Sequence, residues 1–205
     1  ILLDVGANRG DWTRRALDRL SDRELRAEVH AFEPAASTLR FLQGRFEAET
    51  RVRLRPFALS DRAGRASLYV VGELAGTNSL VDMRIGTPTP VAVTTVDAYL
   101  AEQQIERVAF LKSDTEGNDL AVLRGGAGAL AAGRIDVWQF EYNSRWIYAR
   151  AFLRDVFELI VRAPYSLGKL YRRGIELFDT WHPELERYFE TNFVLVRKGT
   201  PLERL

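Results

Sequence analysis

The sequence predicts an α/β fold with a mostly parallel sheet and helices on both of its faces. Apolar runs of strand length alternate with amphipathic stretches of helix length, and this alternation is typical of a doubly wound sheet. Glycine turns or acidic residues directly follow several of these runs, where the carboxyl ends of parallel strands share one edge. A chain of 205 residues is long enough for one such core. We therefore expect a single domain over residues 1–205.

The composition excludes several classes of function. The formal net charge is +1, so the chain has no general attraction for nucleic acid or anionic membranes. It has no cysteine, which excludes disulfides, thiolate metal sites and cysteine catalysis. No apolar run approaches membrane-spanning length. We expect a cytoplasmic enzyme, and because the chain opens on a strand without Met, we expect further residues ahead of it in a longer protein.

The first predicted strand, over residues 1–5, runs into a glycine turn. Gly6 and Gly10 lack a Cβ, so they allow a tight turn and a close approach of a ligand to the backbone. A helix is predicted over Trp12–Leu20, with Asp11 as its N-cap. A strand, a glycine turn and a helix start in this order are typical of sites for nucleotide-like ligands.

Two acidic positions indicate the kind of ligand. Glu33 ends the strand predicted over Glu28–Pro34, at the distance from Gly10 where a carboxylate binds ribose hydroxyls in dinucleotide-binding folds. Asp4 precedes the turn, where a carboxylate repels a pyrophosphate but suits an ammonium group. S-adenosylmethionine has an ammonium group, a ribose and no phosphate. A nicotinamide-dependent oxidoreductase is disfavoured, because the turn also lacks the third glycine of the dinucleotide fingerprint.

The next segments continue the alternation up to an irregular stretch. A helix is predicted over Ser37–Phe46, a third strand over Val52–Leu59 and an antiparallel strand over Ala66–Val71. Glycines and prolines then interrupt Gly72–Pro90, which we interpret as a lid or substrate loop, with a plain surface loop as the alternative. Ser79, at the centre of this stretch, is a candidate substrate contact.

Further strands and helices follow, and several strand ends carry carboxylates. In a parallel sheet these ends lie along one edge, so Glu33, Asp114 and Glu141 are expected to converge there, with Glu116 close to Asp114. The predicted elements are a strand over Val91–Thr95, a helix over Val96–Gln104, a strand from Arg107 to Asp114, a helix over Asp119–Leu123 and a strand over Arg134–Tyr142.

The last part of the chain is expected to complete the sheet and the acceptor side of the site. A helix is predicted over Ala151–Val161, and strands over Ile175–Phe178 and Asn192–Arg197 are expected to pair as an antiparallel hairpin at the sheet edge. Residues 143–190 form a second candidate lid or acceptor segment. Tyr142, Asn143 and Trp146 are candidate acceptor contacts because they follow a strand into the crevice.

The motifs together resemble the FkbM-type S-adenosylmethionine-dependent methyltransferases. The resemblance implies a Rossmann-like methyltransferase fold with a mostly parallel seven-stranded sheet, and methyl transfer to a hydroxyl of a sugar or secondary metabolite. Ser113, Thr115 and Asn118 depart from the residues more usual at their positions. The matching segments are Asp4–Gly10, Phe32–Pro34, Ala58–Asp61, Thr95–Asp97, Leu111–Gly117 and Val122–Ala127.

The resemblance also implies roles for individual residues. The glycine turn would bind the methionine part of the cofactor, Glu33 the ribose, and residues 58–60 the adenine, while Asp114 would face the methyl group. The expected cofactor contacts are Asp4, Gly6, Ala7, Asn8, Gly10, Thr13, Glu33, Pro34, Ala58, Leu59, Ser60 and Asp114.

An acceptor hydroxyl must lose its proton as it attacks, so we take Asp114, Glu116 and Glu141, in this order, as candidate general bases. Alternatively, two of these carboxylates hold a divalent cation such as Mg²⁺ that acidifies the hydroxyl. The expected partner is a small hydroxylated acceptor, such as a sugar, a glycolipid or a polyketide, and no nucleic acid. A second copy of the chain, in a homo-oligomer, is a further candidate partner. The alternative function is that of a non-catalytic methyltransferase-like binding domain.

Overall fold

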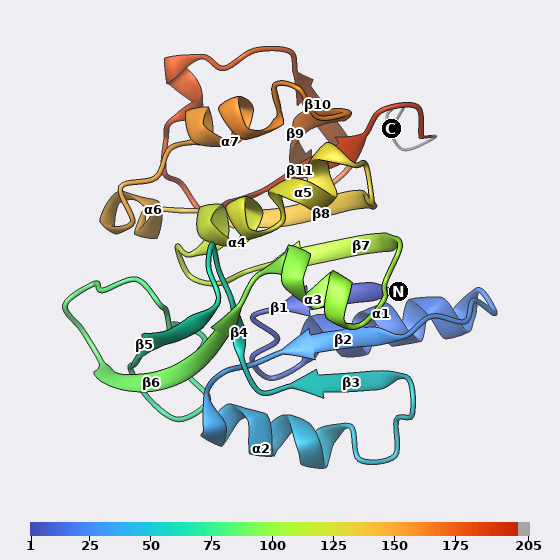
Figure 1. The fold of residues 1–205 in the computed structure, drawn as a ribbon, viewed down its shortest axis with the longest axis vertical. Coiled ribbons are helices and arrows are strands. Elements are labelled where there is room, and N and C mark those ends of the chain that lie inside the picture. Colours follow the sequence, from blue (N-terminus) through green and yellow to red (C-terminus); the bar gives the residue numbers. More distant parts are fainter. Residues whose placement is uncertain (201–205) are drawn as a thin grey trace.

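The structure, a computed structural model, describes residues 1–200 and contains one large sheet and one small sheet (Figure 1). The large sheet has eight strands. They are β1 (Leu2–Val5), β2 (Val29–Phe32), β3 (Val52–Arg55), β7 (Val108–Ser113), β8 (Ile135–Tyr142), β9 (Tyr165–Tyr171), β10 (Gly174–Phe178) and β11 (Thr191–Arg197).

The order of the strands is β10-β9-β11-β8-β7-β1-β2-β3. From β3 to β8 all neighbours are parallel, which confirms the predicted sheet type. The expected pairing of Ile175–Phe178 with Asn192–Arg197 is wrong. β11 pairs with both β8 and β9, so β9 separates it from β10, and the sheet has eight strands where seven were expected.

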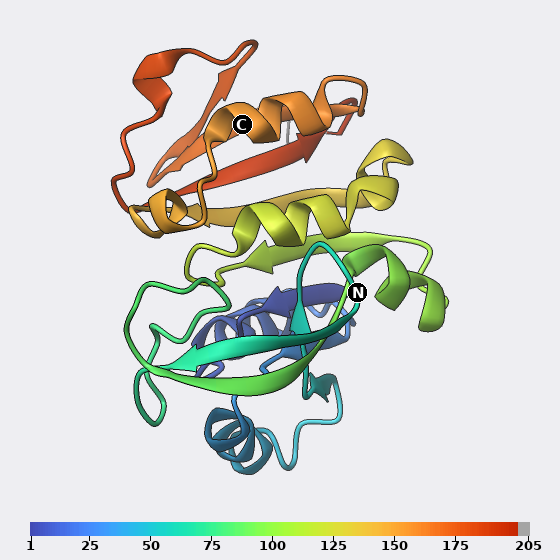
Figure 2. The ribbon, with the colours of Figure 1, turned by 60° about the vertical axis from the view of Figure 1, so that its left-hand side comes forward.

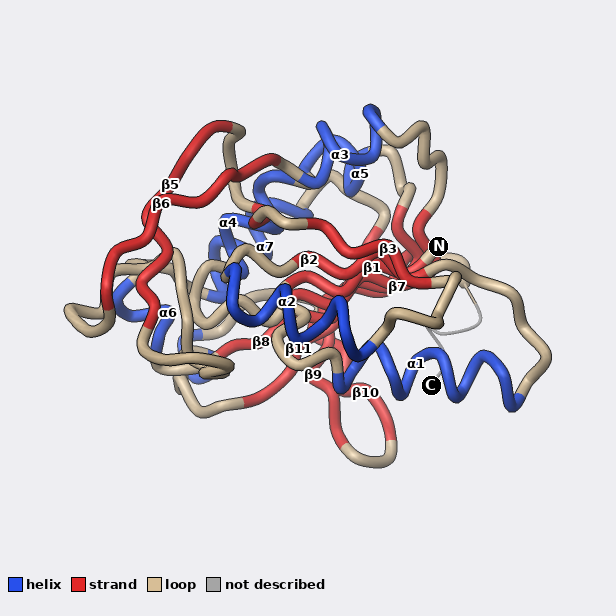
Figure 3. The backbone as a smooth tube through the Cα atoms, turned by 90° about the horizontal axis from the view of Figure 1, so that it is seen from below, coloured by secondary structure: helices blue, strands red, loops and turns tan. Residues whose placement is uncertain are grey.

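Helices cover both faces of the large sheet, as predicted (Figure 3). α1 (Asp11–Asp22) and α2 (Ala36–Arg45) lie on one face. The other face carries α3 (Val96–Glu102), α4 (Asp119–Gly125), α5 (Ala127–Ala131) and α7 (Leu153–Ile160), and a short α6 (Arg145–Tyr148) follows β8. In the described part of the chain, no helix has the length and apolar character needed to cross a membrane.

The alternation of side chains along β1 builds two cores. Leu3 and Val5 pack into the larger cluster beneath α3, α4, α5 and α7. Leu2 packs instead with Leu17 of α1 in a smaller cluster on the opposite face. Successive strand residues point to opposite faces, so Asp4 shares the α1 face with Leu2. The Asp4 carboxylate therefore points toward the residues of α1.

The small sheet consists of β4 (Ala58–Leu59), β5 (Gly64–Val70) and β6 (Thr87–Thr94), in the order β4-β6-β5. β5 and β6 pair in antiparallel orientation, which agrees with the antiparallel strand predicted over Ala66–Val71. The single strand predicted over Val52–Leu59 is wrong, because β3 ends at Arg55 and the chain passes Pro56, which lacks a backbone donor, into the other sheet. The irregular stretch predicted to reach Pro90 ends earlier, because its last residues belong to β6.

The loop between β5 and β6 lies on the same side of the molecule as the carboxyl ends of β1 and β7 (Figure 2).

The start of α1 differs from its prediction. Gly10, at φ 77°, occupies the N-cap, and Asp11 is the first helical residue, with its carboxylate 2.6 Å from the guanidinium of Arg45. A left-handed glycine thus replaces the side-chain cap that Asp11 was expected to provide.

Candidate functional site

A pocket opens between the carboxyl ends of β1, β2 and β7 and the small sheet. Its wall brings together nine of the residues expected in the site, from five separate segments of the chain. They are Gly6, Asn8, Glu33, Pro34, Ala58, Leu59, Ser79, Asp114 and Glu116.

The turn after β1 requires glycine at its first position. Gly6 has φ 79°, and a Cβ added to it would lie 2.0 Å from the carbonyl oxygen of Asp114. The amides of Gly6 and Ala7 both donate to the carbonyl of Phe32. The missing side chain therefore lets β1, β2 and the segment after β7 meet at the floor of the pocket.

Glu33 is held in the pocket wall by the backbone. Its two carboxylate oxygens accept hydrogen bonds from the amides of Asn8 and Ala35, each at 2.9 Å. The residue is buried, and this burial raises the pKa of Glu33 above its usual value although both amides favour the charged form. The side-chain Oδ1 of Asn8 is also buried, and it has no hydrogen-bond partner among residues 1–200. Both residues line the pocket.

Asp4 does not reach the pocket surface. It is fully buried, and its Oδ2 accepts a hydrogen bond of 2.6 Å from the Thr13 hydroxyl. Its Oδ1 lies 3.5 Å from the Nζ of Lys112. Four other expected cofactor contacts do not line the pocket. They are Ala7, Gly10, Thr13 and Ser60.

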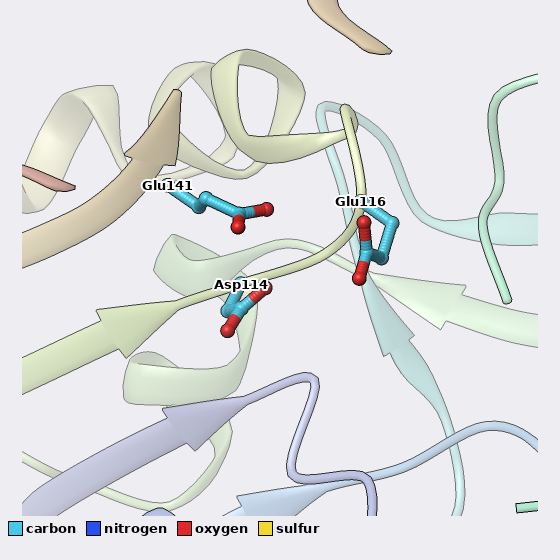
Figure 4. Close-up of side chains that lie close together, drawn as sticks. All are labelled: Asp114, Glu116 and Glu141. Carbon is cyan, nitrogen blue, oxygen red and sulfur yellow. The ribbon is translucent and has the colours of Figure 1, made fainter. Parts of the chain in front are cut away.

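Three carboxylates converge beside the pocket, and they include two of the three strand-end acids that were expected to meet, Asp114 and Glu141, but not Glu33. Oxygens of Asp114, Glu116 and Glu141 all lie within 4.8 Å of one another. Figure 4 shows Asp114 and Glu116 after the end of β7, with Glu141 reaching toward them from β8. Glu33 lies outside this carboxylate cluster. Of the three clustered acids, Asp114 and Glu116 line the pocket together with Glu33, whereas Glu141 does not.

Each carboxylate of the cluster has a donor of its own. Lys112 Nζ lies 3.3 Å from Asp114, and an Arg145 guanidinium nitrogen lies 2.7 Å from Glu116. The Asn143 side-chain amide donates to Glu141 at 2.7 Å. Lys112 is a site residue that the motifs did not indicate, although a lysine inside an apolar strand is a signal in the sequence, because buried lysines are almost always paired.

Burial and mutual repulsion shift the protonation of the cluster. Burial, assisted by the nearby Asp114, raises the pKa of Glu116 to about 7 although Arg145 opposes the shift. The same two causes raise the pKa of Glu141 to about 9. The fully buried Asp119, at the start of α4, has its pKa raised to about 7 by burial and by Asp114. The cluster therefore retains protons at neutral pH.

The residues expected to contact an acceptor are almost fully buried. The Ser79 hydroxyl donates to the carbonyl of Glu116 at 2.8 Å, and so attaches the loop between β5 and β6 to the cluster. The indole of Trp146 donates to the carbonyl of Glu141, while Tyr142 donates to Glu186 and lines a separate cavity. Asn143 binds the cluster directly, as above. Trp146 thus supports the cluster from the core and has no exposed surface for an acceptor.

Two of the residues that depart from the expected motif, Ser113 and Asn118, make buried polar contacts. Ser113 accepts a hydrogen bond from the indole of Trp138 at 3.2 Å. Asn118 accepts a hydrogen bond from Ser60 at 3.1 Å and donates one to the carbonyl of Leu59 at 3.0 Å. Ser60 thus holds the segment after β7 next to the end of β4 and does not itself line the pocket.

Comparisons with known proteins identify a family. The model of the methyltransferase FkbM domain matches residues 4–188. A comparison with curated proteins found no significant match.

Two solved structures illustrate the likeness of the fold. The methyltransferase FkbM from Methylobacillus flagellatus KT superposes with a TM-score of 0.59 at 15% identity, over 95% of this chain and 42% of the other. The CMeT domain of the citrinin polyketide synthase gives a TM-score of 0.52 at 10% identity, over 95% of this chain and 45% of the other. The chain spans less than half the length of either, and such identities show a shared fold alone.

Proposed function

Because the chain belongs to the methyltransferase FkbM domain family, we propose that it binds S-adenosylmethionine and methylates a hydroxyl of a small acceptor. The acceptor class we propose is a sugar-containing molecule, a glycolipid or a polyketide-type metabolite. The observation that carries the proposal is the pocket at the strand ends, where Glu33 is held ready by two amides and a carboxylate cluster lies beside it.

The residues of the pocket fit this cofactor. Glu33 offers carboxylate oxygens for the two ribose hydroxyls, and the Oδ1 of Asn8, which has no partner in the described part of the chain, offers one more acceptor. Ala58 and Leu59 supply an apolar wall suited to an adenine ring. The acidic side of the pocket suits a ligand that carries a positively charged sulfonium and an ammonium group.

When bound, the cofactor would supply an electrophilic methyl group, and the chain has to orient the acceptor, exclude water and take up a proton. We propose Asp114 as the group that takes the proton, because its partly exposed carboxylate lines the pocket. Glu116 and Glu141 are the second and third candidates, since their raised pKa values of about 7 and about 9 leave Glu116 about half protonated and Glu141 largely protonated at neutral pH.

We propose that the cluster works through protons and not through a divalent cation. Lys112, Arg145 and Asn143 already bind its three carboxylates, so the cluster has donors of its own. We therefore expect methyl transfer to be unchanged after dialysis against EDTA, measured as S-adenosylhomocysteine formed with a panel of hydroxylated acceptors. Loss of transfer that added Mg²⁺ restores would contradict this part of the proposal and favour a metal-assisted reaction.

Isothermal titration of the purified protein with S-adenosylmethionine, S-adenosylhomocysteine and NAD tests the cofactor. We expect heat of binding from the two sulfur compounds and none from NAD. The expected dissociation constants are about 1 μM, which corresponds to a binding free energy of about −8 kcal/mol. Heat from NAD alone would overturn the proposal in favour of an oxidoreductase. Binding of both sulfur compounds without product from any acceptor would favour a non-catalytic binding domain.

A further inference from the structure

The strand register brings Lys112 next to Asp4. β1 and β7 are parallel neighbours, and Asp4 lies directly opposite Lys112 in their register. Directly opposite residues of paired strands share a face of the sheet, so both side chains point toward the α1 face. Asp114 follows Lys112 by two positions and continues on that face at the strand end. One ammonium group thus lies between two carboxylates.

The contacts form a continuous path from α1 to the pocket. The Thr13 hydroxyl binds one oxygen of Asp4, and the other oxygen lies 3.5 Å from Lys112 Nζ. The same Nζ lies 3.3 Å from Asp114, which lines the pocket. Asp4 is fully buried and the side chain of Lys112 is 11% exposed, against 38% for Asp114. Only the last residue of the path is open to a ligand.

The charges along this path require one another. A buried carboxylate without a partner is costly, so Asp4 needs the Lys112 ammonium. Burial favours the neutral amine of Lys112, but the carboxylates of Asp4 and Asp114 outweigh it and raise its pKa above the usual value. Lys112 is therefore a cation at neutral pH. An ion pair between Lys112 and Asp4 would by itself compensate the buried charge of Asp4. The further contact of Lys112 with Asp114 extends this ion pair to the pocket wall.

We infer that Lys112 and Asp4 are positioning residues, which hold the Asp114 carboxylate in place at the pocket wall through one shared ammonium group. Asp4 then acts on a ligand through Lys112 and Asp114, and not by contact with the ligand's own ammonium group. The consequence for ligand binding rests on the proposed function, whereas the shared ammonium group is a property of the protein itself.

The first test needs no ligand. The chain has only three lysines, Lys112, Lys169 and Lys198, so the Cε signals in a ¹³C NMR titration are few, and a Lys112→Arg variant assigns the relevant one. We expect Asp114→Asn to lower the pKa of Lys112 by about one pH unit or more, because an opposite charge in contact is removed. Asp18→Asn, on the exposed side of α1, is the matched control. An unchanged titration of Lys112 in Asp114→Asn would overturn the inference.

The second test separates positioning from stability. Lys112→Met leaves Asp4 buried without its cation, so we expect lower stability to urea and weaker binding of S-adenosylhomocysteine. In the double variant Asp4→Asn with Lys112→Met, the unpaired charge is gone and stability should recover. Binding should nevertheless stay weaker than in the wild type by about tenfold or more, since Asp114 still lacks its donor. Recovery of both properties would show a structural role only and overturn the inference.

The two tests keep this inference apart from the proposed function. If the wild-type protein binds neither S-adenosylmethionine nor S-adenosylhomocysteine, the proposed cofactor is wrong, while the response of Lys112 to Asp114→Asn still decides whether the ammonium group is shared. If the cofactor binds and Lys112 does not respond, the inference fails and the proposed function stands.

Discussion

Glu33 is the single residue whose surroundings bear most directly on ligand binding. Both of its carboxylate oxygens are occupied by amides of the chain, so its orientation is fixed before a ligand arrives. A glutamine has only one acceptor oxygen, so its NH₂ would face one of these amides as a second donor. The position therefore tolerates no amide, even though the two side chains have nearly the same shape.

We expect Glu33→Gln to weaken S-adenosylhomocysteine binding by about tenfold or more, since a charge-assisted acceptor is lost. Titration calorimetry measures the change, and circular dichroism checks that the variant is folded. Glu47→Gln, at an exposed position after α2, is the matched control and should bind like the wild type. Equal affinities of the two variants would remove Glu33 from the proposed ribose site.

Asp114 differs from Glu33 because its role is proposed for the reaction. We expect Asp114→Asn to slow methyl transfer by about 100-fold or more, the range for loss of a general base, and to change thermal stability little because the carboxylate is partly exposed. Single-turnover rates and thermal melts of the same preparations measure both effects. Full turnover by this variant would exclude Asp114 as the base and leave Glu116 as the next candidate.

The turn that connects β1 to α1 is the element on which the pocket depends. Ala at position 6 would need the left-handed backbone at φ 79° and would drive its Cβ into the Asp114 carbonyl. We expect Gly6→Ala to lower the free energy of unfolding by about 2 kcal/mol or more and to abolish measurable ligand binding.

Gly44 provides the matched control for this turn. It lies in α2, where an added Cβ meets no atom of residues 1–200 within 4 Å, so Gly44→Ala should stabilise the protein by up to about 1 kcal/mol. Urea denaturation of both variants checks the contrast. A Gly6→Ala protein as stable as the wild type would show that the turn has another conformation.

Element boundaries could be predicted from the sequence where a local signal marks them. The strands before Gly6 and Asp114 carry such signals, and both are found. The break between β3 and β4 also has a local cause, Pro56, but its effect on the pairing is decided by which sheet each half joins. The partner of β10 has no local signal at all, because its choice between β9 and β11 depends on how distant segments pack.

At the scale of the whole molecule, the carboxylate cluster makes stability depend on pH. The pKa of Glu141 is raised to about 9 by burial and by neighbouring carboxylates, so the folded protein binds more protons than the unfolded chain between pH 7 and 9. A raised carboxyl pKa stabilises the fold at low pH, and this contribution is lost as pH rises through the folded value. Glu116, with a pKa of about 7, has lost most of its contribution within this range.

We therefore expect the free energy of unfolding to fall between pH 7 and pH 9, measured by urea denaturation. Glu141→Gln should fall less steeply and should be the more stable protein at pH 9, because it has no carboxyl to ionise. The range from pH 7 to pH 9 lies above the ordinary pKa of His30. Burial lowers the pKa of His30, so this residue makes the free energy of unfolding rise with pH near pH 6, opposite to the effect of Glu141. Stability that rises from pH 7 to pH 9 would contradict the clustering of these acids.

The sequence by itself determined the class of fold and the edge of the sheet at which the site lies. Hydrophobic periodicity and strand-end position are local properties, so the parallel sheet and the placement of Glu33, Asp114 and Glu141 at its carboxyl edge follow from the chain alone. The family resemblance added the proposed ligand.

Only the tertiary structure decided which partner each of these groups has. The register of β1 against β7 gives Lys112 to both Asp4 and Asp114, and the packing of the core takes Trp146 and Asp4 away from the pocket. The raised pKa of Glu141 likewise comes from burial among acids that are far apart along the chain. Such contacts depend on distances between non-neighbouring segments, and no local pattern of residues encodes them.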